Sequence, residues 1–126
     1  MIKYSEHLSQ FLNFLESAKK DYFWYEDELS KQEALTQDYL HQLELEHLNY
    51  SERAKIATKL AACRKARREA KDIITILNPI INYSSVYEKS LNQLKETLGK
   101  VRKEEKAIET RSYNFKVLDK EKITNG

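Results

Sequence analysis

Apolar residues recur at alternating steps of three and four along three stretches of the chain. This spacing is typical of amphipathic helices that pack side by side. The first stretch predicts a long helix over about residues 5–46, with Ser5 as its N-cap. Its inward stripe consists of Leu8, Phe11, Leu15, Ala18, Tyr22, Tyr25, Leu29, Gln32, Thr36, Tyr39 and Leu43.

A turn at residues 47–51 precedes the second helix, which the spacing predicts over about 52–77. Either Asn49 or Ser51 caps its first turn. We expect Pro79 to end this helix, because proline disfavours a helical conformation in the residue before it. The inward stripe of this helix consists of Ile56, Leu60, Cys63, Arg67, Ala70, Ile74 and Leu77.

The third helix is predicted over about 86–110, where Ser85 and Glu88 have the spacing of a capping box. Gly99 falls outside its inward stripe. The periodicity changes after this helix, so residues 112–126 are expected to be an extended or flexible tail beyond a single helical domain over 1–111. The inward stripe of the third helix consists of Tyr87, Leu91, Leu94, Leu98, Val101, Glu105 and Ile108.

These elements predict an all-α, antiparallel three-helix bundle, coiled-coil-like, with an overlong first helix and an up-down-up path. The second helix is too short to cover residues 5–20 of the first, so we expect an exposed apolar overhang there. This overhang is a predicted protein-binding and self-association surface. The alternative is that the first helix breaks near Lys19–Asp21 and folds back. The overhang carries Leu8, Phe11, Leu12, Phe14 and Leu15.

Four consecutive aromatic residues at positions 22–25 cannot all face one core, because each step along a helix turns by about 100°. Tyr22 and Tyr25 fall on the inward stripe, so Phe23 and Trp24 point elsewhere. Since Trp and Phe are enriched at interface centres, Phe23 and Trp24 are predicted to bind a partner. The alternative is that they pack under the third helix or the connection before it.

Charge is distributed unevenly along the chain. Residues 1–50 hold four Lys/Arg and ten Asp/Glu, whereas residues 51–72 hold eight Lys/Arg and three Asp/Glu, although the whole chain carries only +2. This asymmetry indicates either a salt-bridge network between the first two helices or a surface that binds phosphates. The candidate anion- or nucleic-acid-binding residues are Arg53, Arg64, Arg67, Arg68 and Lys71.

Two glycines and one proline are too few for phosphate-binding loops or turn-rich β folds. The single cysteine, Cys63, excludes an intramolecular disulfide and is expected to be a buried thiol. The pairs Glu44–His47 and Asp38–His41 have metal-ligand spacing but lie off the inward stripe, so we expect no metal, cofactor or catalysis. Without a signal peptide or a membrane-spanning run, the chain is expected to be cytoplasmic.

Three blocks between Leu35 and Tyr83 carry a likeness to known proteins: LTQDYLHQLEL, YSERAKIATKLAACRKARREAKD and LNPIINY. In these blocks the chain resembles a group of small helical proteins encoded by temperate phages and prophages of Gram-positive bacteria. The resemblance implies a bacterial cytoplasmic setting and no known activity. It suggests an accessory protein that binds and inhibits a host or defence component. Together with the exposed overhang and the absence of a catalytic motif, this predicts a non-enzymatic homo-oligomer such as a dimer. The alternative is a nucleic-acid- or nucleotide-binding protein that uses the basic second helix.

Overall fold

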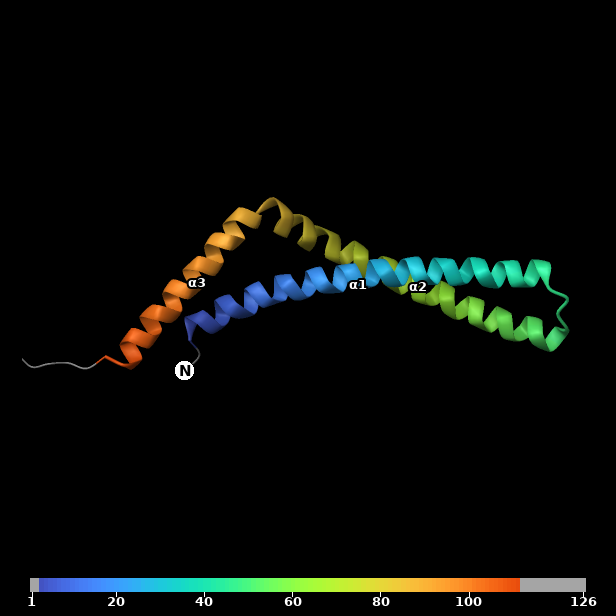
Figure 1. The fold of residues 1–126 in the computed structure, drawn as a ribbon, viewed down its shortest axis with the longest axis horizontal. Coiled ribbons are helices and arrows are strands. Elements are labelled where there is room, and N and C mark those ends of the chain that lie inside the picture. The colour runs from blue at the N-terminus through green and yellow to red at the C-terminus, as the bar shows by residue number, and fades with distance from the viewer. Residues whose placement is uncertain (1–2, 112–126) are drawn as a thin grey trace, which may run out of the picture.

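Three helices make up residues 3–111, the part of the chain that the computed structural model describes. They are α1 (Tyr4–Leu45), α2 (Tyr50–Val86) and α3 (Glu88–Glu109). The expected all-α fold with an overlong first helix is confirmed (Figure 1). The predicted tail at 112–126 lies outside the described residues.

The α1–α2 hairpin is the main body of the fold, and its helices run antiparallel with their inward stripes in contact. Arg67 on α2 lies opposite Glu33 on α1, with 3.2 Å between Nε and Oε1, which shows the register of the two helices. Ile56, Cys63 and Ala70 of α2 are buried in this seam, so the expected burial of the Cys63 thiol is confirmed.

The core is thin along its whole length. Among residues 3–111, no large side chain is fully buried, and most inward positions are only half-buried. Two helices packed along one seam leave more than half of each helix surface outside the contact. Much of the apolar surface of the chain therefore faces solvent.

Asn49 caps α2, which resolves the choice between Asn49 and Ser51. Its side-chain oxygen accepts a hydrogen bond from the backbone N–H of Glu52 at 2.8 Å. This bond satisfies one of the N–H groups that the first turn of a helix leaves without an internal partner. Ser51 lies inside the helix and is exposed.

The predicted end of the second helix was wrong, because α2 continues through Pro79 to Val86. A proline inside a helix removes one backbone hydrogen bond, here to the carbonyl of Thr75. Pro79 and Thr75 are both exposed, so this carbonyl lies on the solvated side of the helix. Meanwhile Ile80 and Ile81 are partly buried and keep the following turn packed.

The longer α2 changes the path of the third helix. By the Arg67–Glu33 register, Val86 ends level with Phe14, so α3 does not return along α2 as the up-down-up path requires. Instead α3 runs antiparallel to α1, toward the N-terminus of the chain (Figure 1). Lys95 pairs with Glu16 at 3.8 Å, and Lys3 pairs with Glu109 further along.

The helix ends at this junction also differ from expectation. The N-cap of α1 is Lys3 rather than Ser5, which is buried and donates its backbone N–H to the Glu105 carboxylate at 3.3 Å. Ser85 lies in the last turn of α2, so it forms no capping box with Glu88. Since α1 is continuous across residues 19–21, the alternative of a break there is also wrong.

The cap assignment predicts the effect of two substitutions on stability. Asn49→Ala removes the bond to the Glu52 N–H and is expected to destabilise the chain by about 1 kcal/mol. The matched control, Ser51→Ala, is expected to change the free energy of unfolding by only a few tenths of a kcal/mol. Urea denaturation followed by circular dichroism measures both. An equal loss in the two variants would show that Asn49 is not the cap.

Candidate protein-docking surface

The predicted overhang is partly covered by the chain itself, because α3 packs against the first third of α1. Leu12 and Leu15 are buried and Leu8 is half-buried, so these three are not the open surface that was expected. Phe11 and Phe14 remain 41% and 53% exposed, although Phe11 was placed on the inward stripe. The exposed part of the overhang is therefore aromatic and lies beside the α3 contact.

A cavity of about 370 Å³ lies where the three helices meet. Its lining includes Leu12, Leu15, Ile81 and Leu91, and the Ser84 hydroxyl at this site has no hydrogen-bond partner in the described structure. The cavity shows that α3 packs loosely near its start. Its tighter contact with α1 lies further along, around the buried Leu98.

The four aromatic residues at positions 22–25 of α1 differ in exposure, as expected from the turn of the helix. Tyr22 and Tyr25 are half-buried, whereas Phe23 and Trp24 are 57% and 60% exposed, so the alternative that α3 covers them is wrong. The Trp24 ring packs edge-on against Tyr25 with centroids 4.9 Å apart. Hydrogen bonding to Glu26 raises the pKa of the Tyr22 phenol.

Helical spacing separates these exposed aromatics into two directions. Phe14 and Tyr25 are eleven residues apart, about three full turns, so Phe14 and the Trp24–Tyr25 pair lie toward one side of α1. Phe23 precedes Trp24 by one step of about 100° and projects elsewhere. By this spacing Phe11, Phe14 and Trp24 fan over about 140° of the helix surface with Phe14 in the middle, whereas Phe23 points away from Phe14.

The two sides of the hairpin differ in chemistry. The Arg67–Glu33 pair marks one side, and Trp24 stands nine residues before Glu33, about two and a half turns away. Ile76 stands nine residues after Arg67, so Trp24 and Ile76 lie at the same level on the opposite side. We call the side that carries the Arg67–Glu33 pair the polar side, and the opposite side carries Trp24 and Ile76 among charged residues of α1 such as Lys20.

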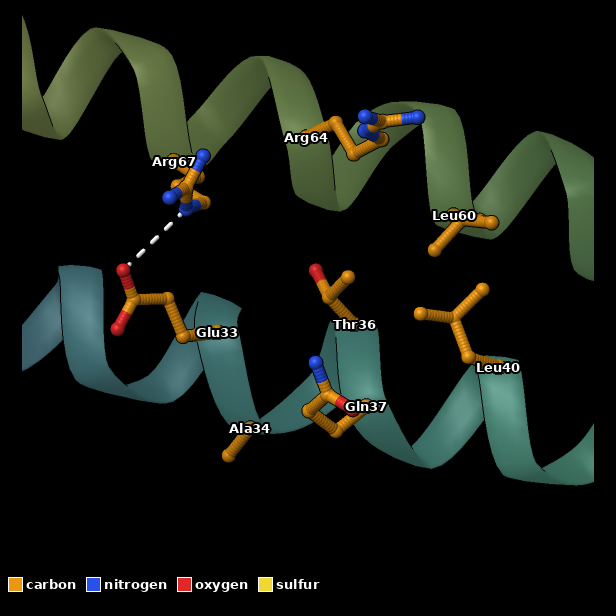
Figure 2. Close-up of a pocket in the computed structure, with 8 residues that line it drawn as sticks. All are labelled: Glu33, Ala34, Thr36, Gln37, Leu40, Leu60, Arg64 and Arg67. Atoms are coloured by element: carbon orange, nitrogen blue, oxygen red, sulfur yellow. Dashed lines mark hydrogen bonds and ion pairs between the residues drawn. The ribbon is translucent and has the colours of Figure 1, made fainter.

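The polar side contains a shallow groove of about 540 Å³ between α1 and α2 (Figure 2). Leu40 and Leu60 face each other at one end, and Arg67 pairs with Glu33 at the other. The Arg64 guanidinium extends along α2 between them and does not point to Glu33. The groove is lined by Glu33, Ala34, Thr36, Gln37, Leu40, Leu60, Arg64 and Arg67.

The predicted salt-bridge network between α1 and α2 is reduced to one pair. Within residues 3–111, Arg67 is the one basic residue of α2 that forms an ion pair. Its partner is Glu33, whereas the adjacent Gln32 donates to Glu28 at 2.7 Å. Arg53 donates to the Leu48 carbonyl at 3.3 Å. Arg64, Arg68 and Lys71 are exposed.

A second apolar stripe on α2 was missed by the sequence reasoning, because the helix was expected to stop before it. We call it the α2 stripe. Its five residues follow steps of three, four, three and four, and no charged residue occurs between Asp72 and Glu88. Both the uncharged run and the heptad spacing could have indicated from the sequence that the helix continues. The α2 stripe consists of Ile73, Ile76, Ile80, Tyr83 and Tyr87.

An electrostatic contact fastens the far end of α3 to the first turn of α1. Hydrogen bonds from Ser5 to the Glu105 carboxylate hold the pKa of Glu105 below its ordinary value, although partial desolvation opposes this. The neighbouring Lys3 ammonium lowers the pKa of Glu105 further. In turn, hydrogen bonding to Glu109 raises the pKa of Lys3. We call this contact the terminal clasp.

No group of three or more potential metal-ligating side chains gathers anywhere in residues 3–111. In the same part of the chain, no helix is long and apolar enough to cross a membrane. No known protein family matches the chain, and no curated protein or solved structure is detectably similar to it.

The terminal clasp predicts a pH dependence. Because the pKa of Glu105 is lower in the folded chain than in the unfolded one, its stabilising contribution is complete above about pH 4.3, the ordinary glutamate value. The contribution is lost as the pH falls through the folded-state pKa. The protection of α3 amides against hydrogen exchange, taken relative to the intrinsic exchange rate at each pH, is therefore expected to fall less on acidification in Glu105→Gln than in the wild type. The exposed Glu104→Gln is the control, and identical pH profiles for Glu105→Gln and wild type would refute the clasp.

Proposed function

We propose that this chain is a non-catalytic, cytoplasmic protein that acts by binding another protein through exposed aromatic residues of α1. The observation that carries this proposal is that Phe11, Phe14, Phe23 and Trp24 remain 41–60% exposed within a single copy. Large aromatic side chains contribute most of the energy in many interfaces when a partner desolvates them. Leaving four of them in water on one half of a helix is unusual for a protein that works alone.

The chemistry of α1 defines the kind of partner. The first fifty residues contain ten acidic and four basic residues, so the aromatics stand in an acidic environment. A complementary partner presents apolar pockets bordered by basic side chains. The resemblance to phage-encoded proteins adds a setting in which that partner is a host or defence protein and binding inhibits it.

The test compares proteins captured from a bacterial lysate by wild type and by Trp24→Ala. A specific partner is expected to be retained by wild type and lost at least tenfold by Trp24→Ala and by Phe14→Ala, because truncating a central aromatic costs about 2 kcal/mol or more. Direct binding of the purified partner, measured by calorimetry, then has to reproduce this order.

Two controls make the test specific. Tyr50→Ala removes an aromatic that is 89% exposed at the hairpin turn, and Arg68→Ala removes a charge from α2. Both are expected to retain the partner. An interaction that survives Trp24→Ala and Phe14→Ala but is lost in Arg68→Ala would overturn the proposal.

A second candidate function, nucleic-acid binding through α2, is favoured by one observation. Arg64, Arg68 and Lys71 are exposed, and none forms an ion pair with another described residue. Arg64 and Lys71 are seven residues apart, about two turns, so both lie on the polar side near Arg67. Such a row of basic side chains is able to track a phosphate backbone.

Salt titration separates this function from protein docking. If α2 binds duplex DNA, the logarithm of the association constant falls with the logarithm of the salt concentration, with a slope of about −0.9 for each phosphate contacted. The double variant Arg64→Ala/Arg68→Ala is then expected to reduce the slope by about two units, while Trp24→Ala leaves it unchanged. Fluorescence anisotropy with a labelled duplex measures both. Absence of binding at low salt would eliminate this candidate.

A further inference from the structure

The α2 stripe is a heptad pattern that the chain itself leaves without a partner. Ile76, Tyr83 and Tyr87 are 64%, 48% and 49% exposed, and Ile73 and Ile80 are half-buried. Ile74, Leu77 and Ile81 form a separate row on α2 and are only partly accessible. This half of α2 therefore carries two adjacent apolar rows, and the outer one lies open.

The helix surface around the α2 stripe is uncharged. At the chain average of 33% charged residues, a run of fifteen would hold about five, yet residues 73–87 hold none. Charges normally keep an exposed helix face solvated and discourage association. Their absence here, next to exposed Ile and Tyr side chains, is typical of a surface that becomes buried.

The α2 stripe also lies away from the rest of the chain. Ile76 is on the side of the hairpin opposite the Arg67–Glu33 pair, as its spacing from Arg67 shows. At the far end of the stripe, the Tyr83 and Tyr87 rings contact each other at a tilt of 42° with centroids 4.8 Å apart. The aromatic end is thus locally ordered before any partner arrives.

We propose that a second copy of this chain occupies the α2 stripe and forms an antiparallel homodimer around a two-fold axis. Four of the five stripe residues pair with each other across such an axis, as a two-fold interface requires, whereas Tyr87 falls opposite Glu69 of the other copy. An axis midway between Ile76 and Ile80 sets Ile76 of one copy against Ile80 of the other, and Ile73 against Tyr83. Each of the four resulting layers pairs a residue at heptad position a in one copy with a residue at position d in the other.

Charge at the ends of the stripe selects the antiparallel arrangement and a copy of this chain as the partner. A parallel pair would set the two 51–72 segments side by side, each with eight basic and three acidic residues. The antiparallel pair separates them and places each near the start of α3 in the other copy, where Glu88 is available. Two uncharged stripes contact each other without electrostatic repulsion, whereas a strongly charged partner finds no complementary charge on them.

The interface is short and lies at the lower end of the sizes found in specific complexes, so the dimer is reversible. Sedimentation equilibrium of the full chain tests it from about 1 to about 200 µM, a range that covers weak interfaces of this size. The apparent mass is expected to rise to twice 14.9 kDa in the wild type. Ile76→Glu, which changes a largely exposed residue, is expected to stay at the monomer mass with unchanged circular dichroism.

A cross-linking experiment tests the register independently. Ile76→Cys and Ile80→Cys variants are mixed and oxidised; the expected product is the mixed disulfide, at least several-fold over either homodimer. Wild type controls for Cys63, which is buried. A wild type that remains monomeric at every concentration, or a dimer that persists in Ile76→Glu, would overturn the proposal.

This inference is independent of the docking function, because the two use different side chains. Tyr50→Glu is the matched control for the dimer, since it adds the same charge at a more exposed site far from the α2 stripe. It is expected to dimerise like wild type. If Ile76→Glu no longer dimerises but still binds the protein partner, the α2 stripe is the dimer interface. If only Trp24→Ala abolishes the dimer, the chain self-associates through α1 and the proposal for the α2 stripe is wrong.

Discussion

The antiparallel seam between α1 and α2 is the interaction on which every other feature depends. Its inward residues on α2 include Cys63 and Ala70, which are small enough to let the two helices approach closely. The Arg67–Glu33 pair shows the register. That register then decides which residues lie at the same level on each side of the hairpin, so it determines where both proposed surfaces lie.

The seam also explains why α3 lies where it does. A 37-residue α2 covers about 55 Å of an α1 that is about 63 Å long, so the pairing ends level with the first third of α1. The single residue Tyr87 separates α2 from α3, the chain bends there, and α3 runs toward the start of α1 (Figure 1). A small buried contact around Leu98 and the terminal clasp complete the attachment.

Periodicity was enough to predict the helices and most of their inward positions, because burial in a two-helix seam follows the heptad, although Phe11, Tyr87 and Ile108 are exposed. Leu29, Thr36 and Leu60 are all partly or fully covered as expected. The rule that a proline ends a helix gave the wrong prediction at Pro79, because the packing of its apolar neighbours outweighs one lost hydrogen bond. The predicted cap at Ser85 was wrong because α2 continues past Pro79 and includes Ser85. The direction of α3, and with it the cover over Leu12 and Leu15, depends on where α2 ends and was not encoded in any local pattern. For the docking surface, the exposure of Phe23 and Trp24 was predictable from spacing, whereas the α2 stripe lay beyond the expected helix end.

The placement of the terminal clasp has a practical consequence for work with this protein. Lys3 and Ser5 stand at the very start of α1 and hold the last turns of α3 through Glu105 and Glu109. An affinity tag fused directly ahead of these residues would crowd the place where the two helix ends meet. A purification handle at the other end of the polypeptide, or one removed by a protease before measurement, leaves this junction intact.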